Sequence, residues 1–97
     1  MQKKNAQPLS EALSDFFREN SRLRYQLAQQ RIIRGWGELL GEGVAKYTTN
    51  IYFNRDTLYV SLTSSVLRAE LMMIKEELIK KLNDHAEMAV VRDIMFR

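Results

Sequence analysis

The feature that most constrains this chain is its middle, where a helical pattern gives way to two strand patterns. Apolar residues recur at helical spacing up to Trp36, and Gly41 then ends the helix. Residues 47–53 are rich in β-branched and aromatic side chains, and residues 57–63 alternate between apolar and polar types. An Asn-Arg-Asp turn separates the two segments. We therefore expect a β-hairpin directly after a helix.

The sequence before the hairpin predicts two helices. Pro8 suits a first helical position, and apolar residues follow it at the spacing of one helix face as far as Phe17. The second helix should run from about Arg22 to Leu40. Its core-facing side should comprise Tyr25, Ala28, Ile32, Ile33, Trp36, Leu39 and Leu40. Residues 1–7 are polar, and we expect them to be disordered.

Two further elements should follow the hairpin. Ser64 or Ser65 should cap a long amphipathic helix that extends to about Asn83. Its core stripe should comprise Leu67, Leu71, Ile74, Leu78 and Leu82. Residues 90–96 should form a third strand that pairs with the hairpin. The predicted fold class is α+β, in the order α-α-β-β-α-β, with helices packed on a three-stranded sheet in a single domain over residues 8–97.

Composition excludes several classes of function. The 97 residues include no cysteine, which excludes disulfides, thiolate zinc sites and a thiol nucleophile. His85 is the only histidine, and no acid–nucleophile arrangement or second ligand accompanies it. We expect no enzyme activity, no metal and no cofactor. No apolar run has the length of a membrane span, and the start lacks the apolar core of a signal peptide, so we expect a cytoplasmic protein.

Positive charge is concentrated in the first third of the chain. Residues 1–35 hold seven basic and three acidic side chains, whereas the remainder holds eight and nine. The candidates for nucleic-acid binding on the predicted second helix are Arg22, Arg24, Arg31 and Arg34. The last three share its polar side, where they would follow a phosphate backbone without reading sequence. A solvated helix face explains the same pattern equally well.

Two more groups of residues are candidates for contacts. The first lies on the hairpin and comprises Lys46, Tyr52, Arg55 and Tyr59. These would offer basic and aromatic contacts, although tyrosines are also ordinary strand residues. The second lies off the core stripe of the last helix and comprises Met72, Met73 and Ile79. Methionine-rich apolar surfaces adapt to partners, but the helix over residues 9–17 could instead cover this group, or a homodimer could form there.

Trp36 is an aromatic residue that could stack on a nucleic-acid base. Its central place on an apolar helix face favours a position in the core instead. Gly35 and Gly37 flank it, and each costs a helix about 1 kcal/mol relative to alanine. We expect them to permit close backbone packing around the indole, with a helix kink as the alternative.

The ordered set of residues from the second helix onward resembles the DciA family. The pattern begins with Trp36 and the segments LLG, VA and YT that follow it. The strand LYVSLTSS then runs straight into the helix VLRAELMMIKEELIKKLN, and VVRDIMFR closes the sequence. The resemblance covers residues 14–97 and rests on the whole set, because no single motif in it is diagnostic. It implies a KH-like domain that acts with the bacterial DnaB-type replicative helicase, which family members help to load onto single-stranded DNA, some of them binding DNA themselves.

Several features of related domains are absent from this sequence. KH domains hold the nucleic-acid backbone with a GXXG loop, whereas the glycines of RGWGELLGEG are spaced GxG, GxxxG and GxG. We therefore expect a KH-like shape without KH-type binding chemistry. Many DciA relatives carry a long basic tail after the domain, whereas this sequence ends at Arg97, so its basic first third is a candidate substitute. Some carry a zinc ribbon, which needs cysteines that this chain lacks.

These observations together predict a non-enzymatic accessory of DNA replication. It would bind the replicative helicase and, weakly, single-stranded DNA. The alternatives are a general RNA- or nucleic-acid-binding module without a helicase partner, and a structural homodimer.

Overall fold

The structure is a computed structural model that describes residues 11–12 and 20–97 of the chain. Of the helix expected from Pro8 to Phe17 it describes only Glu11 and Ala12, which are helical. The rest of that prediction, and the disorder expected for residues 1–7, fall outside the described residues.

Helix α2 spans Ser21–Leu40, within one residue of the predicted bounds. Its apolar stripe faces the core as expected, with Ala28, Ile32 and Trp36 buried. Gly41 ends the helix with a φ of 89°, a left-handed value that L side chains rarely adopt. A single additional turn, α3 (Glu42–Ala45), precedes the sheet and was not expected from the sequence.

The predicted β-hairpin is confirmed. Strands β2 (Thr48–Asn54) and β3 (Thr57–Leu62) pair antiparallel, and Arg55 takes a positive φ of 59° in the turn between them. Strand β4 (Asp93–Phe96) lies parallel to β3, which makes a mixed sheet in the order β2-β3-β4. A parallel pair needs a crossover connection, and the helical segment between β3 and β4 supplies it.

The long helix predicted between the hairpin and the last strand is divided in two. Helix α4 spans Ser65–Met73 and α5 spans Lys75–Ala86, because Ile74 has non-helical angles (φ −113°, ψ 23°). The expectation of one continuous helix was therefore wrong. Ile74, which we expected in the core stripe, is exposed instead.

The division of the helix has a tertiary cause. The segment contains no proline or glycine that would break a helix locally. Helix α4 contacts β3, whereas α5 contacts α2 and β4, so the interruption at Ile74 separates two segments that pack against different partners. Leu71 on α4, with Leu78 and Leu82 on α5, is buried as predicted.

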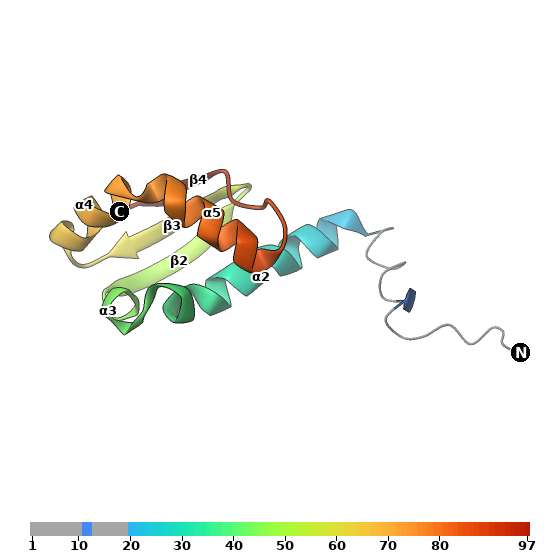
Figure 1. Ribbon diagram of the computed structural model, residues 1–97, viewed down its shortest axis with the longest axis horizontal. Helices are drawn as coiled ribbons and strands as arrows, with labels where there is room; N and C mark the ends of the chain where they lie inside the picture. Colours follow the sequence, from blue (N-terminus) through green and yellow to red (C-terminus); the bar gives the residue numbers. More distant parts are fainter. Residues whose placement is uncertain (1–10, 13–19) are drawn as a thin grey trace, which may run out of the picture.

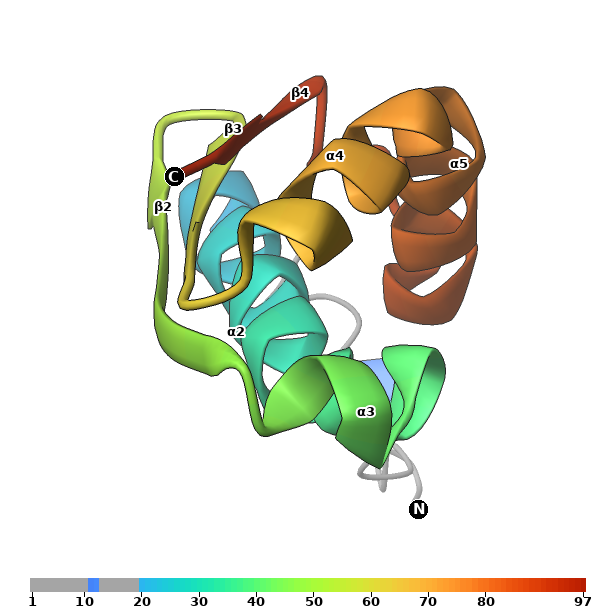
Figure 2. The same cartoon turned by 90° about the vertical axis from the view of Figure 1, so that its left-hand side faces the viewer.

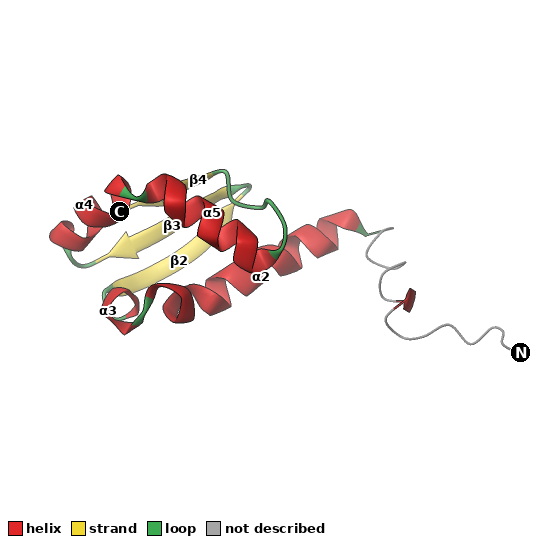
Figure 3. Ribbon diagram, viewed as in Figure 1, coloured by secondary structure: helices red, strands yellow, loops and turns green. Residues whose placement is uncertain are grey.

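The described elements form two layers. Helices α2, α4 and α5 lie on one side of the sheet (Figures 1 and 2). The core lies between the layers and includes the inward residues of the strands, among them Leu58, Val60 and Ile94. The longest connection between described elements, residues 87–92, joins α5 to β4 (Figure 3). In the described part of the chain, no helix combines the length and apolar character that crossing a bilayer requires.

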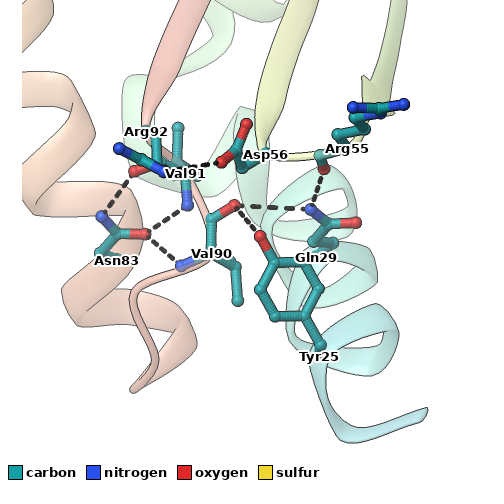
Figure 4. A network of polar contacts seen from close by, with 8 residues as sticks. All are labelled: Tyr25, Gln29, Arg55, Asp56, Asn83, Val90, Val91 and Arg92. Atoms are coloured by element: carbon teal, nitrogen blue, oxygen red, sulfur yellow. Dashed lines mark hydrogen bonds and ion pairs between the residues drawn. The ribbon is translucent and has the colours of Figure 1, made fainter. Parts of the chain in front are cut away.

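The connection before β4 is held by the side chain of Asn83 together with a backbone hydrogen bond from the Arg92 N–H to the Asp56 carbonyl, at 2.8 Å. Asn83 Oδ1 accepts hydrogen bonds from the N–H groups of Val90 and Val91, at 3.0 and 2.9 Å, and its Nδ2 donates to the Val91 carbonyl at 3.0 Å (Figure 4). The third strand is consequently shorter than predicted, beginning at Asp93 instead of residue 90.

Helix α2 is tied to the same connection and to the hairpin turn. Tyr25 donates to the Val90 carbonyl at 3.3 Å (Figure 4). Gln29 Nε2 donates to the Arg55 carbonyl at 2.6 Å, and lies 3.4 Å from the Val90 carbonyl. These hydrogen bonds attach α2 to the hairpin turn and to the connection before β4.

Candidate nucleic-acid and partner surfaces

The arginines of α2 lie where the sequence predicted them. Because Ile32 and Trp36 turn one side of the helix into the core, Arg24, Arg31 and Arg34 are exposed. Arg22 is also exposed, near the start of the helix.

A cleft of about 420 Å³ lies between α2 and α5, and two of these arginines line it. Its lining residues are Leu27, Gln30, Arg31, Arg34, Gly35, Glu38 and His85. Arg31 Nη1 donates to the Ala86 carbonyl at 3.3 Å, at the end of α5. Helix C-terminal carbonyls carry partial negative charge, so this contact is favourable. The cleft thus collects two guanidinium groups and an imidazole beside a single carboxylate, whereas Arg22 and Arg24 lie outside its lining.

His85 is a cleft residue that the sequence analysis did not place in a candidate site. A Cβ on Gly35 would lie 2.6 Å from His85 Nε2, closer than real Cβ contacts allow. The absence of a Cβ at Gly35 therefore makes room for the imidazole of His85. Gly37 lies opposite Ala45, where an added Cβ would be at an ordinary 3.4 Å. A glycine inside a helix indicates that another residue can pack closely against it. The sequence does not specify that this residue is His85.

Trp36 is a core residue. Its side chain is 3% exposed, and its indole Nε1 donates to Thr48 Oγ1 at 3.0 Å. The Thr48 hydroxyl in turn donates to the Val44 carbonyl at 2.9 Å. The indole is therefore not available for stacking on a base.

The hairpin candidates do not form one cluster. Tyr52 and Tyr59 are cross-strand neighbours with stacked rings, whose centroids are 5.1 Å apart. Lys46 lies before β2, with its ammonium 5.4 Å from the ring centroid of Tyr47, while Arg55 lies in the turn at the far end of the same strand. The structure thus brings the two tyrosines together and separates the two cations.

The candidate partner residues on α4 and α5 also differ in their surroundings. Met72 and Met73 are 59% and 85% exposed. Ile79 is partly buried and packs against the core cluster. The interruption at Ile74 puts it on a different helix from the methionines. The helix over residues 9–17, which could have covered this group, lies largely outside the described residues.

Among the residues that the structure describes, two ionisable groups have a pKa that is clearly shifted from its ordinary value. The hydrogen bond from Lys75, at 2.9 Å, is the main cause that lowers the pKa of the Asp93 carboxyl. Burial, followed by the nearby charge of Asp56, raises the pKa of the Tyr25 hydroxyl. Among residues 11–12 and 20–97, no group of three or more His, Cys, Asp or Glu side chains is placed to hold a metal ion.

Comparison with known proteins identifies the family. The family described as Dna[CI] antecedent, DciA, matches residues 8–96. The chain belongs to the DciA family. The resemblance noted in the sequence is thereby confirmed, and it links the chain to the loading of the DnaB helicase in DNA replication. DciA is not a known catalytic family. No curated protein and no solved structure matches the chain.

The DciA match takes in every element from α2 to β4. It therefore covers the arginine side of α2, the exposed methionines of α4 and the tyrosine pair of the hairpin alike.

Proposed function

We propose that this DciA-family chain is a non-enzymatic accessory of DNA replication that acts in the cytoplasm. It binds the DnaB-type replicative helicase and, weakly, single-stranded DNA, and so assists helicase loading. The family match over residues 8–96 is the observation that carries this proposal. The mechanism is differential binding: the chain favours a helicase state that admits DNA, and so shifts the population toward that state.

The helicase contact is assigned to the exposed apolar part of α4. Met72 and Met73 stand out from the helix, and Val66 near its start is 69% exposed. Exposed methionines adapt to a partner's shape because their side chains are unbranched and polarisable. Ile79 lies on α5 and is partly buried against the core, so it is left out of this surface.

The DNA contact is assigned to the arginines of α2 and the cleft beside them. Arg31 and Arg34 line the cleft and Arg24 lies exposed on the same helix, with Lys46 and Arg55 as outlying cations. Few phosphate contacts give weak binding that falls steeply with salt.

The helicase assignment is tested by capture with the purified replicative helicase of the same organism, with nuclease present throughout. The wild-type chain should retain the helicase, and Met72→Ser with Met73→Ser should lose it. Leu23→Ser, which changes an exposed apolar residue on α2, should behave as wild type. Helicase capture that is lost on nuclease treatment would instead favour a general nucleic-acid-binding module.

The DNA assignment is tested by fluorescence anisotropy with labelled single-stranded DNA over a range of salt. Arg31→Glu with Arg34→Glu should lower affinity and make its salt dependence shallower, since phosphate contacts release counterions. Lys80→Glu with Lys81→Glu on α5 changes the net charge equally and should have a smaller effect. Unchanged affinity and salt dependence in the arginine variant would remove this assignment.

A further inference from the structure

The face of the sheet turned away from the helices carries an ordered set of side chains. Strand alternation and register place three rows of three residues on it. The middle row is Tyr52, Tyr59 and Met95, and the outer rows are Asn50, Ser61, Arg97 and Asn54, Thr57, Asp93. Arg97 belongs beside Ser61 because its backbone bonds to Val60 and Leu62 at 2.8 Å. We call these nine positions the open sheet face.

The centre of the open sheet face is an assembled stack. The rings of Tyr52 and Tyr59 are nearly parallel, with an interplanar angle of 7° and centroids 5.1 Å apart. The guanidinium of Arg97 lies 4.7 Å from the Tyr59 centroid. Because β3 lies between β2 and β4, Tyr59 has the second tyrosine on one side and the arginine on the other. Tyr52 itself lies on the edge strand β2, so its outer ring face is turned away from Tyr59, toward the outer edge of the sheet.

The charge of the open sheet face suits a polyanion. Asp93 is the one acidic side chain among the nine, and its carboxylate is ion-paired with Lys75 at 2.9 Å. Arg97 contributes a cation within the face, and Lys46 and Arg55 lie beyond the two ends of β2. The remaining polar positions carry amides and hydroxyls, which can hydrogen-bond to base edges and to phosphates.

The centre of the face combines aromatic rings with a cation. Tyr52 and Tyr59 are half-buried there, and Arg97 is exposed beside them. Aromatic rings beside a cation are a means by which proteins hold single strands, because each base has a flat face on which to stack.

We propose that the open sheet face binds single-stranded nucleic acid, with a base stacked on the outer ring face of Tyr52, the Tyr59 ring supporting Tyr52 from behind, and a phosphate held by Arg97. This rests on the proposed single-strand binding, and it locates the base contacts on the side of the molecule opposite the α2 arginines. Duplex DNA, whose bases are already stacked on one another, binds this face more weakly.

The proposal is tested by the affinity of tyrosine variants for labelled oligothymidylate and oligouridylate. Tyr52→Ala weakens binding by about 5-fold or more, the lower bound for loss of one stacked base. Tyr59→Ala also weakens binding, because it removes the ring that supports Tyr52 and the ring beneath Arg97. Tyr59→Phe and Tyr52→Phe keep the ring and bind as wild type. Arg97→Ala weakens binding and reduces its salt dependence. Far-ultraviolet circular dichroism and thermal melting identify any variant that fails to fold.

A second measurement needs no variant. Amide resonances of the ¹⁵N-labelled wild-type chain are followed as oligothymidylate is added. Shifts concentrated in β2, β3 and residues 95–97 support the proposal. Resonance shifts confined to α2 overturn the proposal but leave the proposed DNA binding intact. If the resonances of the sheet shift when helicase is added without DNA, the face docks a protein and the proposal is overturned. Absence of any DNA binding overturns it as well, whereas helicase capture separately decides the proposed function.

Discussion

At the scale of single residues, the hydrogen bond between Trp36 and Thr48 joins the end of α2 to the start of the sheet. The indole is almost fully buried, so its N–H depends on this one hydroxyl for a partner. A buried donor without an acceptor costs more than the net value of an ordinary hydrogen bond.

We predict that Thr48→Val destabilises the fold by about 1–3 kcal/mol, because it keeps the shape of the side chain and removes the acceptor. Urea unfolding followed by tryptophan fluorescence measures the loss. Thr49→Val is the matched control, since that exposed hydroxyl bonds only to the Ser61 carbonyl, at 3.3 Å. Equal losses in the two variants would contradict the role given to Thr48.

The two glycines of α2 allow a second prediction at this scale. Gly37→Ala should stabilise the chain by about 0.5–1 kcal/mol, because alanine favours helix and its Cβ fits against Ala45. Gly35→Ala should not yield this gain, because the Cβ meets the His85 ring. Thermal melting of the two variants measures the difference. In a His85→Ala background Gly35→Ala should become stabilising; if it does not, the imidazole is not what the glycine admits.

At the scale of elements, side-chain contacts at the two ends of α5 hold the crossover from β3 to β4 in place. Asn83 holds the segment that enters β4. Lys75, the first residue of α5, is ion-paired with Asp93, the first residue of β4. The two ends of α5 are thus attached to the same short strand and its approach.

Asn83→Ala should destabilise the chain by at least about 2 kcal/mol, because three hydrogen bonds are lost and the buried Val91 N–H is left without its acceptor. Chemical denaturation gives the free energy, and hydrogen exchange of the Val91 amide should accelerate. Asp84→Ala, which removes only an exposed ion pair with Lys80, should cost well under 1 kcal/mol. A similar cost for both would show that Asn83 does not hold the segment.

The ion pair between Lys75 and Asp93 predicts a pH dependence. Its hydrogen bond lowers the pKa of Asp93 in the folded state below the ordinary value of 3.8, so the stabilisation is present above that pH and is lost as pH falls through the lowered pKa. Lys75→Met should therefore be less stable than wild type at neutral pH, by less than about 1 kcal/mol because both groups are partly exposed. The difference should vanish in acid. Unfolding curves over a pH series measure it, with Lys81→Met as the control; a difference that persists in acid would contradict the assignment.

At the scale of the whole molecule, the two-layer arrangement separates the charged and the aromatic surfaces. Helix α2, which carries the arginines, lies in the helical layer on one side of the sheet (Figure 2). Strand alternation and register place the tyrosine pair on the other face of the sheet. Each surface can therefore be changed without altering the contacts of the other.

This separation predicts distinct signatures for the two surfaces in DNA binding. Arg31→Glu with Arg34→Glu should change the salt dependence of single-strand affinity, whereas Tyr59→Ala should weaken binding nearly equally at all salt concentrations. Because the two surfaces lie on different elements and share no residue, the effects of the two changes on binding free energy should add. Strong non-additivity in anisotropy titrations would show that the two surfaces are not independent.

Local patterns in the sequence were enough to predict α2, the hairpin and the α+β class. Helical spacing of apolar residues specified which side of α2 is buried, and strict alternation specified which residues of β3 face inward. The arginines on the polar side of α2 followed from the same periodicity. Such features depend on neighbours within a few residues, so the sequence alone carries them.

Other features were decided by contacts between segments that lie far apart in the chain. The break at Ile74 arises because α4 and α5 pack against different partners, and β4 is short because Asn83 takes the hydrogen bonds of Val90 and Val91. The placement of His85 against Gly35 and of Arg97 over Tyr59 likewise joins residues distant in sequence. Periodicity determines which face an element buries, but only the packed structure determines what that face meets.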